Sequence, residues 1–175
     1  QTCALPISPP VSPSIAAGSV AARNREFSLA RANFLPLAEQ GNADAQRAMG
    51  QLLMQDCTGI QDKAAAVSWL EKAVASGNVV AELQLARAYL RGFGVAQDDS
   101  KAFALYSQAA ATNNPIAQME VGYMYNTGRG VPEDKFVGLQ WSVKAGEQGN
   151  AIALSNIARA YIKGEVLPRD IDRAA

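Results

Sequence analysis

The chain has 175 residues, 49% of them hydrophobic, with 16 basic and 16 acidic side chains and no His. This length is typical of one soluble domain, and a net charge of zero provides no long-range field that would attract nucleic acid or anionic lipid. The absence of His removes the commonest general base, the commonest zinc ligand and every Ser-His or Cys-His pair. Two Cys cannot form a disulfide framework or a four-thiolate metal site. The composition therefore disfavours an enzyme and a metal centre.

Residues 1–22 are expected to form a disordered or extended lead-in. Residues 1–7, QTCALPI, resemble a translated sequencing adapter rather than protein-coding sequence. The residues that follow mix Pro, Ser, Gly and Ala without apolar periodicity, and Pro cannot donate a backbone hydrogen bond. A degenerate signal peptide is the alternative, although the uninterrupted apolar core and the basic N-terminal region of such a signal are missing. No run in the chain approaches the roughly 18 apolar residues of a membrane span.

The remainder of the chain, residues 23–175, repeats itself every 36 residues. Polar and small columns recur at Asn42, Asn78, Asn114 and Asn150, at Ala45, Ala81, Ala117 and Ala153, and at Asp62, Asp98, Asp134 and Asp170. Large apolar residues recur at Met49, Leu85, Val121 and Ile157. Each of them is followed directly by a small residue, at Gly50, Ala86, Gly122 and Ala158. Self-similarity at a fixed period is the signature of a repeat architecture. We predict a partial unit at 23–41, full units at 42–77, 78–113 and 114–149, and a truncated unit at 150–175.

Each unit is predicted to contain two antiparallel helices. Apolar residues follow the Asn column at the spacing of one helical face, and Asn itself is a good N-cap. Gly92 and Gly128 are predicted to end the first helix in the left-handed region, and the Asp column to cap the second helix. One helix pair cannot bury its own apolar face, so neighbouring units must stack. The predicted fold is all-α, a right-handed α-solenoid.

The strings LARAYLRGFGV at 85–95 and VGYMYNTGRGV at 121–131 resemble the Sel-one-like repeat, a relative of the tetratricopeptide repeat. The resemblance covers approximately residues 25–175. Asp56 and Thr58 depart from it, because they replace the two loop glycines of the first full repeat. The resemblance implies a non-catalytic protein–protein interaction scaffold or adaptor, without a cofactor, that binds a protein segment or peptide on its concave surface.

We select as candidate partner-binding residues those whose type varies between repeats, in contrast to the core positions, which keep the same type of residue. Positions 47, 51 and 54 of the first helix and their equivalents lie away from the line predicted to be buried, at positions 45, 49 and 53, and toward the inner wall if the repeats stack as in the family. We call the selected residues the concave stripe: Arg47, Gln51, Leu83, Arg87, Arg91, Met119, Tyr123, Asn126 and Arg159. Arg, Tyr and Met are enriched at protein interfaces. The alternative is that the arginines only solvate one face.

Two other functions stay open at this point. Cysteine-rich relatives have been linked to penicillin binding and β-lactam hydrolysis, although their regular Cys pairs are missing here. An RNA-binding helical array would depend on the arginines of the concave stripe, and zero net charge argues against it. No catalytic, cofactor-binding or metal-binding residue is predicted. Apolar surface near Ala175 is expected to favour end-to-end self-association, and the sequence does not decide between a bacterial periplasmic or secreted location and the cytoplasm.

Overall fold

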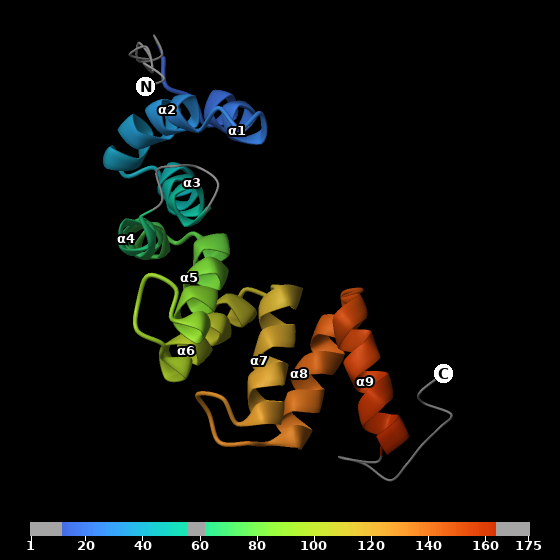
Figure 1. Ribbon diagram of the computed structural model, residues 1–175. Coiled ribbons are helices and arrows are strands. Elements are labelled where there is room, and N and C mark those ends of the chain that lie inside the picture. Colours follow the sequence, from blue (N-terminus) through green and yellow to red (C-terminus); the bar gives the residue numbers. More distant parts are fainter. Residues whose placement is uncertain (1–11, 56–61, 164–175) are drawn as a thin grey trace. The chain divides into compact units, whose positions relative to one another are not determined.

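The computed structural model describes residues 12–55 and 62–163, and these residues form nine α-helices and no strand (Figure 1). The helices are α1 Ile15–Arg23, α2 Phe27–Glu39, α3 Ala43–Met54, α4 Lys63–Ala75, α5 Val79–Arg91, α6 Asp99–Ala111, α7 Pro115–Thr127, α8 Lys135–Glu147 and α9 Ala151–Lys163. The predicted all-α helical-repeat fold, with its period of 36 residues, is confirmed.

The chain divides into two compact units, which are described separately. Unit 1 comprises residues 1–81 with 93–95, and unit 2 comprises residues 82–92 with 96–175. The helices α1 to α4 therefore belong to unit 1 and α6 to α9 to unit 2, while α5 starts in unit 1 and continues in unit 2.

The predicted helix caps are confirmed in both units. In each case a side-chain oxygen of the cap accepts a hydrogen bond, 2.9–3.1 Å long, from the backbone N–H three residues further on. The capping residues are Asn42, Asn78, Asn114 and Asn150 for the first helices and Asp62, Asp98 and Asp134 for the second helices. Gly92 and Gly128 have the predicted positive φ angles of 64° and 66°. Asp170, the last member of the Asp column, lies outside the described residues.

The predicted lead-in is wrong for residues 15–22, which belong to helix α1. Ser14 caps this helix by accepting a hydrogen bond from the Ala17 N–H at 3.4 Å. Gly18 and Ala21 are buried in the contact with α2, and a Cβ at Gly18 would overlap the ring of Phe34. Helical structure depends on this packing, because a nine-residue helix is marginal alone in water. Residues 1–11 of the lead-in lie outside the described residues.

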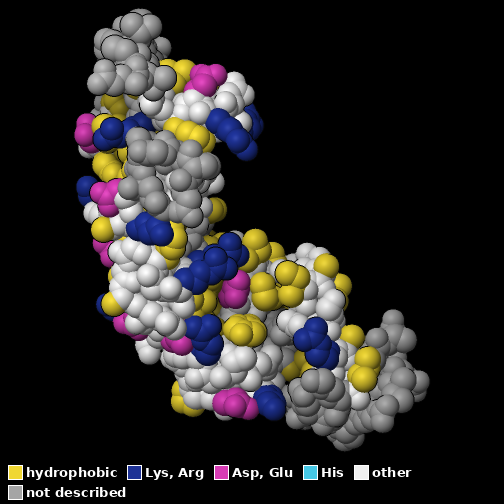
Figure 2. All heavy atoms as spheres, in the orientation of Figure 1, with side chains coloured by type: hydrophobic (Ala, Val, Ile, Leu, Met, Phe, Trp, Pro, Cys, Tyr) yellow, Lys and Arg dark blue, Asp and Glu magenta, His cyan; other side chains and the backbone are white. Residues whose placement is uncertain are grey.

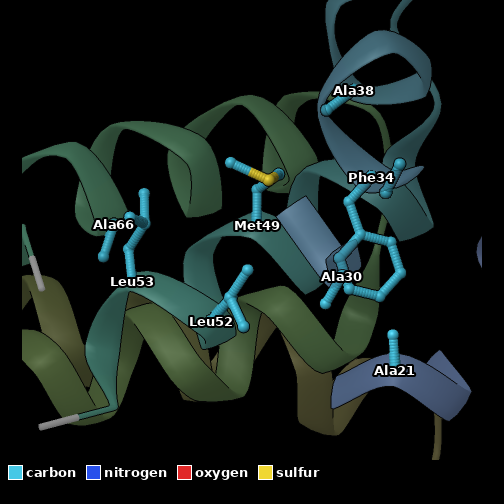
Figure 3. Packing of buried hydrophobic residues seen from close by; sticks show 9 residues of the cluster. Ala21, Ala30, Phe34, Ala38, Met49, Leu52, Leu53 and Ala66 are labelled. Carbon is cyan, nitrogen blue, oxygen red and sulfur yellow. The ribbon is translucent and has the colours of Figure 1, made fainter. Parts of the chain in front are cut away.

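Helices α1 to α4 share one hydrophobic core in unit 1. Figure 3 shows the ring of Phe34 pointing from α2 toward Ala21 of α1. The buried residues of this core are Ala21, Ala30, Phe34, Ala38, Ala45, Met49, Leu52, Leu53 and Ala66. The three side chains on the predicted inward line of α3, at positions 45, 49 and 53, are all among them.

The two helices of a repeat approach closely at the small column. An ideal Cβ at Gly122 of α7 would lie 2.8 Å from the Gly138 carbonyl oxygen and 3.0 Å from the Ser142 Oγ of α8. In unit 1, a Cβ at Gly50 of α3 would lie 2.7 Å from the Leu70 Cγ of α4. These distances are shorter than van der Waals contacts allow, so both crossings depend on the absence of a side chain.

We predict that Gly122→Ala lowers the free energy of unfolding by roughly 1–3 kcal/mol, because the added methyl group overpacks the contact with the α8 backbone. The higher helix propensity of Ala than of Gly would by itself raise the free energy of unfolding, by about 1 kcal/mol. Urea denaturation measures the difference. The control variant Gln140→Ala, at an exposed position of α8, should stay within about 0.5 kcal/mol of the wild type. A more stable Gly122→Ala protein would contradict the close crossing.

In unit 2, one ion pair connects the loop after α7 to the start of α6. The Arg129 guanidinium donates from Nε to Asp99 Oδ2 at 3.0 Å and from Nη2 to Asp99 Oδ1 at 2.8 Å. It also donates to the Leu90 carbonyl oxygen at 3.4 Å. The hydrogen bonds from Arg129 are the main reason why the pKa of Asp99 is lowered from its ordinary value of 3.8. The bidentate pair therefore joins neighbouring repeats.

We expect Asp99→Asn to lower the free energy of unfolding at pH 7 by a few tenths to about 1 kcal/mol, since the pair is partly exposed. A lowered carboxyl pKa stabilises the fold above the ordinary value and loses this effect as pH falls through the folded-state pKa. The difference between wild type and variant should consequently shrink as the pH falls below the ordinary carboxyl value of 3.8. In urea titrations, the double variant Asp99→Asn/Arg129→Gln should lose no more than the worse single variant. Fully additive losses would show that the two side chains do not interact.

A buried polar residue follows the first three members of the Ala column by one position, whereas the fourth member, Ala153, is followed by the exposed Leu154. In unit 1, Gln46 uses both ends of its amide: Nε2 donates to the Ala38 carbonyl oxygen and Oε1 accepts from Ser76. In unit 2, Gln118 likewise donates to Asn113 and accepts from Gln148. Glu82 occupies the equivalent position, 3% exposed, and its Oε2 has no hydrogen-bond partner among the described residues. Burial raises the pKa of Glu82 above its ordinary value of 4.5.

We predict that Glu82→Gln raises the free energy of unfolding at pH 7 by roughly 1–2 kcal/mol, because an ionised carboxylate is costly to bury when one of its oxygens, Oε2, has no hydrogen-bond partner among the described residues. A raised carboxyl pKa stabilises the folded state below the ordinary value and loses this effect as pH rises through the folded-state pKa. The advantage of Gln should therefore grow from below pH 4.5 to neutral pH. Thermal melts of variant and wild type at a pH below 4.5 and at pH 7 measure this difference in stability. A variant that is less stable than wild type at pH 7 would refute it.

Candidate functional site

The residues of the concave stripe lie in both units. Arg47 and Gln51 are on α3 in unit 1, and the rest are on α5, α7 and α9 in unit 2. Each group is therefore described within its own unit.

In unit 2, α5 and α7 bring charged and aromatic side chains together. Arg87 Nη2 of α5 lies 3.8 Å from Glu120 Oε1 of α7, with the two side chains 51% and 20% exposed. Arg91 lies one helical turn further along α5, and Tyr123 of α7 is 44% exposed. Figure 2 shows basic, acidic and hydrophobic side chains side by side on the surface over α5 and α7. We call Arg87, Arg91, Glu120 and Tyr123 the α5–α7 patch; it carries two positive charges and one negative charge.

Glu120 was not a sequence candidate, yet it sets the electrostatics of the patch. Burial raises the pKa of Glu120, and the nearby guanidinium groups of Arg87 and Arg91 oppose that rise. Tyr106 of α6 is fully buried, and its hydroxyl has no hydrogen-bond partner among the described residues. Burial, together with the charge of Glu120, raises the pKa of Tyr106 to about 12, with Arg87 acting in the opposite direction. At neutral pH, Tyr106 is a neutral phenol below a positively charged surface.

Two of the candidates in unit 2 serve packing rather than an open surface. Leu83 is only 7% exposed, because it lies three residues before the buried Ala86 and so borders the same helical face. Asn126 is half-buried against α8, where a Cβ at Gly138 would overlap the Asn126 side-chain oxygen. It lies four residues after Gly122, on the line of the helix crossing. The expectation that Leu83 lies at an exposed surface is therefore wrong, whereas a partner-binding role of the half-buried Asn126 stays a prediction.

The other candidates in unit 2 differ in exposure. Met119 is half-buried, whereas Arg91 and Arg159 are exposed. Arg91 is close enough to Glu120 to affect its pKa. Arg159 lies on α9, outside the α5–α7 patch. The structure thus gathers Arg87, Arg91 and Tyr123 of the predicted stripe around Glu120.

In unit 1, the structure places Arg47 and Gln51 in a pocket of about 360 Å³ between α1, α2 and α3. We call this space the α1–α3 pocket, and its lining residues are Ser19, Ala22, Arg23, Phe34, Arg47, Ala48, Gln51, Leu52 and Gln55. Sequence analysis missed Ser19 and Arg23 because it assigned this region to a lead-in or to the partial unit. A Ser followed by an Ala-rich segment, the cap of α1, was the signal that could have shown the helix.

Neither surface has the arrangement of a metal centre. Among the described residues, no group of three or more His, Cys, Asp or Glu side chains could hold a metal ion. The helices of residues 12–55 and 62–163 are also too short or too polar to cross a membrane. Both surfaces offer guanidinium groups beside apolar groups on helices; the α1–α3 pocket adds amides, and the α5–α7 patch adds one carboxylate.

Comparison with known proteins identifies the repeat. The family model described as Sel1 repeat matches four consecutive segments, residues 43–78, 79–114, 115–150 and 151–175. Among curated protein sequences, no significant match was found.

Solved structures with the same architecture include two bacterial proteins. A Sel1 repeat protein from Oxalobacter formigenes is similar with a TM-score of 0.83 and 27% identity, over 92% of this chain and 66% of that protein. A protective antigen of uropathogenic Escherichia coli, c5321, which displays an SLR fold, is similar with a TM-score of 0.71 and 30% identity, over 85% of this chain and 30% of the antigen. The chain thus spans less than two thirds of either protein.

A third similar structure is the cysteine-rich protein B of Helicobacter pylori. It has a TM-score of 0.57 and 20% identity, over 73% of this chain and 92% of that protein. At this identity the likeness concerns the fold alone. The four Sel1 matches cover most of the sequence and agree with the observed caps and helix pairs. The chain therefore belongs to the Sel1 repeat family, whose members generally serve as protein–protein interaction scaffolds.

Proposed function

We propose that this chain is a non-catalytic scaffold that binds a segment of a partner protein on the exposed surface of its first helices. The observation that carries the proposal is the α5–α7 patch, where two arginines share one partly buried carboxylate and an exposed tyrosine lies on the adjacent helix. The extension of the binding surface along the whole concave stripe stays a prediction.

The composition of the patch favours an acidic partner segment with an aromatic or aliphatic anchor. Glu120 neutralises only one of the two guanidinium groups, so the patch keeps a net positive charge. Arg87 remains half-exposed in its ion pair and, with five N–H donors on each guanidinium group, can bind a second carboxylate. Tyr123 presents an apolar ring with a polar tip, a combination that is enriched at the energetic centres of interfaces.

Two features of the α5–α7 patch favour binding over catalysis: its side chains project from helices, and the phenol beneath it is neutral. The side chains of the patch project from helices α5 and α7, so the backbone that carries them is already ordered before a partner binds. The phenol of Tyr106, buried beneath the patch, has its pKa raised to about 12 and stays protonated at neutral pH. It is therefore a poor general base.

The test is selection of peptides from a random phage-displayed library on the full chain, followed by affinity measurements with purified peptides. Selected peptides should be rich in Asp, Glu and aromatic residues. The double variant Arg87→Glu/Tyr123→Ala should bind them at least about tenfold more weakly, because it reverses one charge of the patch and removes its aromatic anchor.

The matched control is Lys144→Glu, which reverses a charge at an exposed position of α8 outside the patch. It should bind the selected peptides like the wild type, and circular dichroism should show that both variants keep the helical content of the wild type. Peptides that bind the double variant as tightly as the wild type would refute the assignment of the patch.

A further inference from the structure

The α1–α3 pocket in unit 1 has a separate chemistry from the patch in unit 2. Its volume of about 360 Å³ lies within the range of small-ligand pockets. Apolar atoms come from Ala22, Phe34, Ala48 and Leu52. Its polar lining, as far as residues 12–55 and 62–163 form it, contains two guanidinium groups, two side-chain amides and one hydroxyl and no acidic residue: Ser19, Arg23, Arg47, Gln51 and Gln55.

Among the described residues, the two arginines of the pocket have no carboxylate partner, unlike Arg87 and Arg129. Arg87 pairs with Glu120 and Arg129 with Asp99. In residues 12–55 and 62–163, neither Arg23 nor Arg47 forms an ion pair. Arg47 Nη1 donates to Gln51 Oε1 at 3.2 Å, which uses one of its five N–H groups.

Solvation of a helix face does not account for Arg47. Arg23 lies in the last turn of α1, where a cation interacts favourably with the helix dipole. Arg47 lies inside α3, and the equivalent positions of the next two repeats carry the buried Leu83 and the half-buried Met119. A guanidinium group therefore stands at a position that is apolar in those repeats, and it faces the pocket that α1 creates.

We propose that the α1–α3 pocket binds an organic carboxylate that carries a short apolar group. The carboxylate would accept hydrogen bonds from Arg47 and Arg23, in the bidentate geometry that suits a guanidinium group. The apolar group would cover Ala48 and the edges of Phe34 and Leu52. Such a carboxylate belongs either to a free small molecule or to the C-terminal residue of a peptide.

The experiment titrates the ¹⁵N-labelled full chain with four probes and follows amide chemical shifts. Hexanoate represents the free carboxylate and hexanamide its neutral counterpart. N-acetyl-Ala-Leu with a free C-terminus represents the peptide, and its C-terminal amide is the neutral counterpart. We expect a saturable shift of the Ala48 and Gln51 amides with at least one carboxylate, and at least about tenfold weaker binding of the matching neutral probe.

Saturation by hexanoate alone would identify a free small molecule as the source, and saturation by the peptide alone a C-terminus; either result supports the site. Arg47→Gln should weaken binding at least about tenfold, whereas Arg31→Gln, at an exposed position of α2 outside the pocket, should leave it unchanged. If Arg47→Gln proves less stable in thermal melts, Arg23→Gln gives the second test, with the same weakening expected.

Three results would overturn the proposal. The first is the absence of saturable shifts with both carboxylates up to about 10 mM. The second is equal binding of each carboxylate and its neutral counterpart. The third is unchanged binding by folded Arg47→Gln and Arg23→Gln. Because the pocket and the α5–α7 patch share no residue, failure here leaves the peptide-binding test in unit 2 unaffected.

Discussion

Close contact between the two helices of a repeat is the constraint on which the remaining features depend. At Gly50 and at Gly122 a side chain would enter the space of the partner helix. The helices can approach only because these positions are small, and the Asn and Asp caps set where each helix begins. Packing between helices, rather than propensity, supplies most of the stability of such short elements.

The same packing determines which side chains can bind a partner. Residues on the crossing line, such as Asn126, contact the second helix of the repeat. Leu83 borders the buried face of its own helix and is buried as well. Arg87 and Tyr123 remain at the surface, four residues beyond Leu83 and Met119 respectively. Where α1 adjoins α2 and α3, the same arrangement leaves a pocket with two arginines. A repeating scaffold can thus carry different chemistry at equivalent positions.

The repeat could be predicted from sequence because its determinants are local. The N-cap Asn114 and the C-cap Gly128 each act within one turn of helix. They can be recognised in the sequence because equivalent residues recur every 36 positions. Helix α1 was missed although Ser14 before an Ala-rich segment signals a cap, because the contact of Gly18 with Phe34 that holds the helix is not visible in the composition. The role of Glu120 also depends on a different helix, the one that carries Arg87. The positions of Leu83 and Asn126, by contrast, follow from their spacing to Ala86 and Gly122 and were available in the sequence.

Nuclear Overhauser effects between the paired helices test the close crossing most directly. In a spectrum of the full chain, the α protons of Gly122 should show cross-peaks to protons of Gly138 and Ser142, and those of Gly50 to the methyl groups of Leu70. These contacts join residues that are at least 16 positions apart in the sequence, so helix formation alone cannot produce them. Their absence in a folded, helical sample would mean that the hairpins do not pack as described, and the exposed surfaces assigned here would lose their basis.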